Sequence, residues 1–161
     1  MSAVIDTALQ DKNTGPREEW LQFLLDGQSY GLNVLQIQEI LYGGLIEPVP
    51  GSPPHVLGVI NLRGSIVTVV DTRMRLGLES REPGETEWIV ILDVLGETVG
   101  LMVDEVLEVH IFNPERVEKM AGTDLVGHEL HVSGVIELDA IGMLILLDAA
   151  SVSGLRREDQ G

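Results

Sequence analysis

Residues 58–71 of the chain read Gly58-Val59-Ile60-Asn61-Leu62-Arg63-Gly64-Ser65-Ile66-Val67-Thr68-Val69-Val70-Asp71. Two apolar runs meet here at a corner that carries the only cation of the stretch, Arg63. An Asn-Leu-Arg-Gly corner between two β-rich runs predicts a hairpin with one arginine at its tip. This arginine has no obvious partner nearby in the sequence, so it binds either backbone carbonyls of its own chain or the carboxylate of another protein.

Further apolar runs bounded by turn signals predict that the rest of the chain is also mostly strand. They occupy residues 20–25, 29–33, 88–92, 98–112, 132–138 and 143–147. The strong turn dipeptide Asp26-Gly27 joins the first two runs into a hairpin. Residues 88–92 are apolar without interruption, which is typical of a strand buried on both faces, and Asp104-Glu105 indicates a bulge or bend in the long run.

One segment shows a helical period instead. Val34, Ile37 and Leu41 recur at helical spacing after Asn33, which can cap a first turn. A pair of glycines at positions 43 and 44 ends the pattern. We therefore expect a short helix here, with Glu39 near its rim and on a different side from Ile37.

The connections between the runs have their own signals. Four prolines forbid a regular central strand through residues 47–54, which predicts an extended connector at a sheet edge. Asp71 is placed to cap a short helix that closes at Gly77. Residues 79–87 hold four acids, a proline and a glycine, so we expect a solvated loop between two halves of the fold.

Composition and size favour one domain or two small fused barrels. The chain has 161 residues, 44% of them hydrophobic and only two each of Trp, Tyr and Phe. Cysteine is absent, which excludes disulfides and thiolate metal sites and favours a reducing compartment. We find neither a signal peptide nor an apolar run of spanning length, so we expect a soluble, cytoplasmic protein that does not insert into membranes.

The net charge limits the possible partners. Ten basic residues face 26 acidic ones, which gives a formal charge of −16. A chain of this charge is repelled at long range by nucleic acid and by anionic lipid surfaces. The acidity either serves solubility or matches a partner with a basic face.

Motifs for catalysis are not found in the sequence. It has no phosphate-binding glycine loop, no Gly-x-Ser-x-Gly and no cysteine nucleophile. His128 and His131 are one residue short of the zinc-protease spacing, so we expect no metal, no cofactor and two ordinary loop histidines. Two classes of function remain, a protein-interaction module and a small-ligand barrel.

The central hairpin and its flanks resemble the CheW-type chemotaxis coupling family. Its signature is a Pro-rich entry, a Gly-Val-Ile-Asn-Leu-Arg-Gly hairpin and an Asp-Leu-Arg-x-x-Leu-Gly exit. Here these read Pro50-Gly51-Ser52-Pro53-Pro54, Gly58 to Gly64, and Asp71-Thr72-Arg73-Met74-Arg75-Leu76-Gly77. Residues 30–34, 37–40, 99–106 and 144–148 continue the resemblance in the same order, so it extends over residues 18–155.

The resemblance implies an all-β protein with short helices, built as two fused SH3-like five-stranded barrels. Proteins of this family are non-enzymatic adaptors that join the cytoplasmic tips of chemoreceptors (methyl-accepting chemotaxis proteins) to the regulatory domain of a chemotaxis histidine kinase. The groove between the barrels takes the receptor helix, a recognition mode that needs no pocket chemistry. Ile37 would then make an apolar receptor contact, while Glu39 and Arg63 would set the register of the receptor helix through charge. The alternative role for Arg63 is structural support of Glu39.

The same resemblance implies a kinase-binding region around Ile46, Val49 and Leu57, where the alternative is ordinary barrel core. Leu57 occupies a position that is often polar or basic in relatives. An exposed Leu57 would add to the contact, and a buried one would be excluded from the site. Thr72 replaces the usual leucine of the Asp-Leu-Arg motif, which affects local packing only.

The expected layout is a flexible leader at residues 1–17, a coupling domain of two barrel subdomains at residues 18–155 and a flexible tail at residues 156–161. Because this domain fills nearly the whole chain, a stand-alone coupling protein is favoured over a receiver-fused adaptor or a kinase fragment. The alternatives are a small-ligand-binding β-barrel and a coupling protein for a non-flagellar chemosensory pathway.

Overall fold

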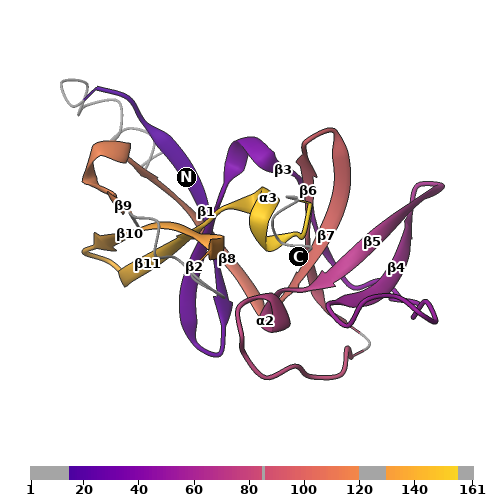
Figure 1. The fold of residues 1–161 in the computed structure, drawn as a ribbon. Coiled ribbons are helices and arrows are strands. Elements are labelled where there is room, and N and C mark those ends of the chain that lie inside the picture. Colours follow the sequence, from indigo (N-terminus) through magenta and orange to yellow (C-terminus); the bar gives the residue numbers. More distant parts are fainter. Residues whose placement is uncertain (1–14, 85, 120–129, 156–161) are drawn as a thin grey trace.

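The computed structural model describes residues 15–84, 86–119 and 130–155 (Figure 1). Most of the expected leader and all of the expected tail lie outside these ranges. The strands are β1 (Glu18–Leu25), β2 (Gln28–Asn33), β3 (Ile37–Tyr42), β4 (Val56–Leu62), β5 (Ser65–Asp71), β6 (Trp88–Val94), β7 (Glu97–Val103), β8 (Glu105–Phe112), β9 (Glu118–Lys119), β10 (Val132–Leu138) and β11 (Gly142–Leu147). The short helices are η2 (Val34–Gln36), α2 (Thr72–Arg75), η3 (Pro114–Arg116) and α3 (Ala149–Val152). None of the helices among these residues has the length and apolar character needed to cross a bilayer.

The strands form two curled sheets that lie side by side, with α3 between them in Figure 1. The first sheet, here called barrel A, has the strand order β8-β1-β2-β11-β10-β9, and the second, barrel B, has the order β3-β6-β7-β5-β4. Barrel A thus contains β1 and β2 from the first part of the chain and β8 to β11 from the last part, and barrel B contains the strands between them, β3 to β7. The predicted all-β fold with two SH3-like barrels is confirmed, with the short β9 as a sixth strand in barrel A.

Three apolar clusters stabilise this arrangement. The interior of barrel B is filled by one cluster around Ile89, Ile91 and Met102, and the interior of barrel A by another around Trp20 and Phe112. The third and largest cluster lies between the barrels and includes residues of both sheets. Burial of this much apolar surface is the main favourable term in folding.

Strand β6 supplies side chains to two of these clusters. Ile89 and Ile91 face the interior of barrel B, whereas Val90, Leu92 and Val94 face the layer between the barrels. Successive side chains of a strand point to opposite faces, so an uninterrupted apolar run is what two buried faces require. The prediction that residues 88–92 are buried on both faces is confirmed.

Both predicted hairpins are present, and each closes with a two-residue loop. Asp26 and Gly27 have φ values of 50° and 78°, and Arg63 and Gly64 have φ values of 50° and 89°. Positive φ at both loop positions matches the right-handed twist of the flanking strands, which is the reason such loops favour Asp-Gly and related pairs. The Asn61 side chain accepts a hydrogen bond from the Gly64 N–H at 2.9 Å and orders the second loop.

The prediction of a helix after Asn33 is wrong beyond the first turn. Asn33 does cap a turn, because its side chain accepts a hydrogen bond from the Leu35 N–H at 2.9 Å, but that turn is the three-residue η2. The chain then becomes β3 and pairs with β6, with a register shift between Ile37 and Glu39. Ladder pairing with β6 satisfies the backbone there, so the helical rim position expected for Glu39 does not exist.

The loop over residues 79–87 is less solvated than expected. Glu87 is buried, and both of its carboxylate oxygens accept hydrogen bonds from Arg81 at 2.9 Å. The Gly84 N–H also donates to this carboxylate. Burial alone would raise the pKa of Glu87, but its hydrogen bonds, chiefly those from Arg81, hold the pKa below its usual range.

A glycine is needed at position 58 because the backbone of Glu47, in the connector before β4, passes close to it. The backbones of Glu47 and Val59 exchange two hydrogen bonds of 2.9 Å, and a Cβ on Gly58 would lie 2.6 Å from the Glu47 carbonyl carbon. Backbone atoms cannot rotate away from such a clash. The connector that carries Ile46 and Val49 therefore depends on this glycine.

We predict that Gly58→Ala lowers the free energy of unfolding by about 3 kcal/mol or more, because it overpacks this contact. The control is Gly64→Ala: a Cβ there meets nothing within 4 Å, so only the left-handed backbone costs, about 1 kcal/mol. Urea titration of both variants measures the difference. Equal losses would contradict the packing argument.

Candidate functional site

The site residues Glu39 and Arg63 meet across the open edge of barrel B. Strands β3 and β4 are the two edge strands of this sheet, and the β4–β5 hairpin tip brings Arg63 over β3. The guanidinium of Arg63 donates two hydrogen bonds to the Glu39 carboxylate, one of them 3.2 Å long. Arg63 therefore has a partner within the chain, and it is a carboxylate instead of the backbone carbonyls that were one alternative.

This ion pair is accessible to solvent. The Arg63 side chain is 66% exposed and the Glu39 side chain 25% exposed. The hydrogen bond from Arg63 lowers the pKa of Glu39, and the hydrogen bond to Glu39 raises the pKa of Arg63. Exposed pairs contribute little to stability because water screens them, so the pair orders the hairpin tip and presents two adjacent, opposite charges to a partner.

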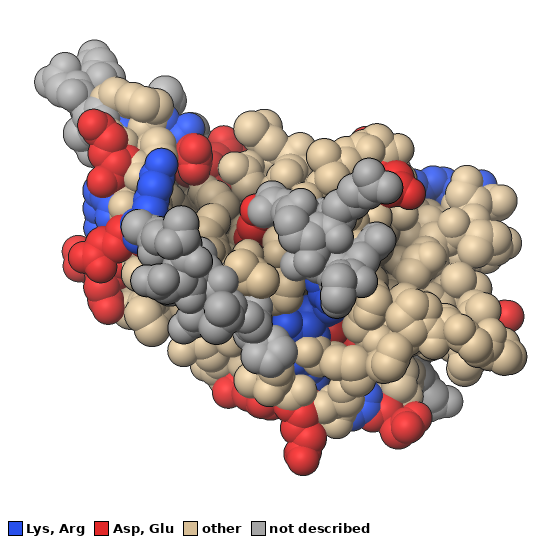
Figure 2. Space-filling model, in the orientation of Figure 1, with Lys and Arg blue, Asp and Glu red and all other residues tan. Residues whose placement is uncertain are grey.

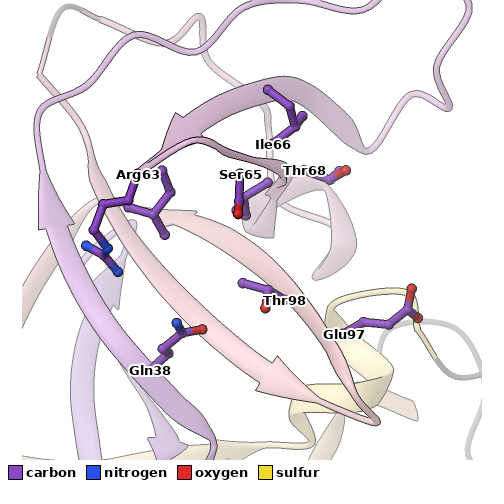
Figure 3. A pocket seen from close by; sticks show the side chains of 9 residues that line it. Gln38, Arg63, Ser65, Ile66, Thr68, Glu97 and Thr98 are labelled. Atoms are coloured by element: carbon purple, nitrogen blue, oxygen red, sulfur yellow. The ribbon is translucent and has the colours of Figure 1, made fainter.

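A hollow of about 590 Å³ lies on one side of the pair (Figure 3). Side chains of Gln38, Ser65 and Thr98 approach it from β3, β5 and β7. The complete lining is Gln38, Leu62, Arg63, Ser65, Ile66, Val67, Thr68, Glu97 and Thr98. These elements all belong to barrel B, so the hollow lies at the rim of one barrel.

A second hollow of about 360 Å³ lies farther along the same edge. Its lining is mostly apolar or glycine: Leu41, Gly43, Gly44, Leu45, Glu47, Val59, Ile60, Asn61 and Ile66. Ile66 contributes to both hollows. The Glu39–Arg63 pair therefore stands on a continuous edge that offers apolar and polar surface on either side of two fixed charges.

The surface around this edge carries few charges. In the view of Figure 2 the side formed by the β4–β5 hairpin is mostly uncharged, whereas acidic side chains gather over barrel A and along the lower rim. A weakly charged surface with a central ion pair is suited to binding another protein. Among the described residues of this edge we find no activated nucleophile and no pair of buried carboxylates.

The structure separates the other predicted site residues into two groups. Ile37 is half-buried and packs against the cluster between the barrels. Ile46 and Leu57 are half-buried and pack together against the core of barrel B, while Val49 is 42% exposed on the connector. Leu57 thus falls between the exposed and buried outcomes considered from the sequence.

Several exposed apolar residues at this edge were missed from the sequence. Leu45 is 75% exposed, Ile66 is 66% exposed and Tyr42 is 62% exposed. Gly43 and Gly44 both have φ near 100°, and this backbone carries Leu45 away from the core. The glycine pair was the available signal for Leu45, whereas β5 has apolar residues on both of its faces, which hides the side of the sheet that Ile66 takes.

The histidines do not form a metal site within the described ranges. Groups of three or more His, Cys, Asp or Glu side chains placed to hold an ion are not found there. His131 is buried, not an ordinary loop histidine, because its Nδ1 lies 2.6 Å from the Ser151 hydroxyl of α3. His128 lies outside the described residues.

The titration of Glu39 provides a direct test of the ion pair. We predict that Arg63→Met raises the pKa of Glu39 toward its ordinary value, because the hydrogen bond that lowers it is lost. Carbon-detected NMR of the Glu39 carboxyl measures this shift. Arg116→Met removes an exposed arginine of barrel A and should leave the Glu39 titration unchanged. A Glu39 pKa that is the same in wild type and Arg63→Met would contradict the pairing.

Comparison with known proteins gives a family model and several relatives that match most of this chain. The family model for the CheW-like domain matches residues 19–156. The chemotaxis protein CheW of Rhizobium meliloti (strain 1021) is 35% identical over 96 residues, which cover 60% of this chain and 62% of that protein. CheW of Bacillus subtilis (strain 168) is 32% identical over 134 residues, covering 77% of this chain and 86% of that protein.

A solved structure has the same fold. The scaffolding protein TtCheW from Thermoanaerobacter tengcongensis matches with a TM-score of 0.74 and 28% sequence identity. The match covers 83% of this chain and 90% of TtCheW. With a family model that spans most of its length and this two-barrel structure, the chain belongs to the CheW-like domain family.

Proposed function

We propose that this protein is a non-enzymatic adaptor in chemotaxis signal transduction. It couples the cytoplasmic tips of chemoreceptors to the regulatory domain of a chemotaxis histidine kinase, and it acts in the cytoplasm without a cofactor. The observation that carries this proposal is membership in the CheW-like family over residues 19–156. The exposed, weakly charged edge of barrel B supports it, because such a surface suits recognition and lacks groups for catalysis.

The proposed receptor-binding residues are Ile37, Glu39 and Arg63. An amphipathic helix docks through apolar residues at helical spacing and takes its register from charged neighbours. The Glu39–Arg63 pair supplies two adjacent opposite charges, and the hollow beside it has room for side chains of such a helix. Ile37 is partly accessible and would make the apolar contact from the start of β3.

The proposed kinase-binding residues are Ile46, Val49 and Leu57. Val49 is exposed on the connector, and Ile46 and Leu57 reach the surface over the core of barrel B. Partly exposed apolar residues on a well-packed support are typical of interface anchors. Leu45 lies one residue from Ile46 and is largely exposed, and we add it to this face.

The experiment for the proposed function combines the protein with a receptor cytoplasmic fragment and a chemotaxis kinase. Co-sedimentation and an increase in kinase autophosphorylation are the expected results. The small-ligand barrel remains a second candidate because the 590 Å³ hollow is lined by hydroxyl and amide groups. It predicts neither result, and instead predicts a thermal shift with a metabolite.

We predict that Arg63→Glu leaves the fold intact and weakens receptor coupling at least tenfold, about 1.4 kcal/mol. Charge reversal at an exposed tip costs little in water, whereas it places like charges together when a partner excludes water. Urea titration and receptor co-sedimentation measure the two effects separately. Arg116→Glu, a charge reversal on barrel A, should change neither.

A charge-swapped variant separates recognition from support of the hairpin. Glu39→Arg combined with Arg63→Glu restores an ion pair but reverses its direction. If the receptor recognises which of the two positions carries which charge, receptor coupling stays weak in the double variant. Recovery of coupling would mean that Arg63 only supports the hairpin through Glu39, and other residues would then have to make the receptor contact.

A further inference from the structure

The short helix α2 lies on barrel B and carries two arginines that reach barrel A. Arg73 binds Asp104 with both ends of its guanidinium, Nε to Oδ1 at 3.0 Å and Nη2 to Oδ2 at 2.7 Å. Asp104 lies where the chain leaves β7 of barrel B and enters β8 of barrel A. Arg73 Nη2 also lies 2.8 Å from Asp26 Oδ1 at the tip of the β1–β2 hairpin.

The second arginine makes a separate contact with α3. Arg75 donates from Nε to the Val152 carbonyl at 3.0 Å and from Nη2 to the Ser151 carbonyl at 2.7 Å. Both carbonyls belong to α3, which follows the last strand of barrel A and lies between the barrels. One four-residue helix therefore makes two contacts outside its own sheet, with the β1–β2 tip of barrel A and with α3.

The base of α2 is held firmly to barrel B. Asp71 is 1% exposed, caps the helix by accepting a hydrogen bond from the Met74 N–H at 3.3 Å, and accepts another from the Ser80 hydroxyl at 2.8 Å. The Asp71 N–H donates to the His55 carbonyl at 2.8 Å. Because the base is anchored in this way, the direction of the two arginines is set by barrel B.

The charges of Arg73 and Asp104 are well compensated by neighbouring groups. The Arg73 side chain is only 14% exposed, and Asp104 also accepts a hydrogen bond from the Asp26 N–H at 2.9 Å. Burial alone would raise the pKa of Asp104, but hydrogen bonds from Arg73 and Asp26, with the charges of Arg73 and Arg81, hold its pKa below the usual range. Partly buried pairs of this kind are screened less by salt than exposed ones.

The apolar layer between the barrels holds them together but does not by itself choose one orientation. Hydrophobic contact is non-directional. Bidentate arginine–carboxylate bonds, in contrast, have a narrow geometry. We infer that α2 is a clasp that fixes the relative orientation of the two barrels, with Arg73 and Arg75 as its positioning residues.

This inference rests on contacts within the chain and does not depend on the proposed partners. The absence of cysteine in the sequence allows clean spin labelling at two introduced sites. Ala140→Cys on barrel A and Asp93→Cys on barrel B are both at exposed positions. Pulsed electron paramagnetic resonance then measures the distance between the barrels as a distribution.

The expected result is a broader distance distribution for Arg73→Met, and a still broader one when Arg75→Met is added, while the amide NMR spectrum stays that of a folded protein. Met keeps much of the aliphatic stem and removes the charge and the hydrogen bonds. Arg63→Met is the matched control, because Arg63 pairs with Glu39 within barrel B, and its distribution should equal that of the parent. Unchanged distributions for both clasp variants would overturn the inference.

A milder variant keeps the test decisive if Arg73→Met does not fold. Asp26→Asn alters only the contact at the hairpin tip, where the Asp26 side chain is 48% exposed. A distribution broader than that of the parent supports the clasp. An identical distribution in a folded protein that combines Asp26→Asn with Arg75→Met, which together change the contacts at the hairpin tip and at α3, would overturn the inference.

Discussion

The apolar layer shared by the two barrels is the constraint on which the rest of the structure depends. Strands β6 and β7 are covered on one side by the interior of barrel B and on the other by barrel A. Each barrel therefore buries apolar residues against its neighbour as well as in its own interior. Strands β3 and β4 remain the edge strands of barrel B.

Polar contacts between the barrels are directional, whereas the apolar contacts between them are not. At the clasp, partly buried arginines bind specific oxygens across the boundary between the barrels. At the rim of barrel B, Glu39 and Arg63 make a similar pair in the open, where it contributes little to stability. The same chemistry thus occurs once where water is restricted and once where water is free.

Local sequence signals predicted local structure well and failed where pairing with a distant segment decided the outcome. The loops at Asp26-Gly27 and Arg63-Gly64 were predicted because positive φ depends on those residues alone. The helix after Asn33 was predicted because Ile37 and Leu41 are four residues apart. Pairing with β6 instead makes a strand, and its register shift lets Ile37 pack against the layer between the barrels and Leu41 against the interior of barrel B. Glu87 was placed in a solvated loop because it lies in a charged stretch, but hydrogen bonds from Arg81 of the same stretch allow it to be buried.

Short motifs and apolar runs were sufficient to predict the family, the two-barrel β fold, the hairpin loops and the Asp71 cap. The tertiary structure was needed to show that Arg63 pairs with Glu39, 24 residues away, and that the two arginines of α2 reach the β1–β2 tip and α3. It was also needed to show which apolar side chains of β5, such as Ile66, remain exposed. These outcomes depend on which surfaces meet when the sheets curl and pack, and that information is not contained in any one segment.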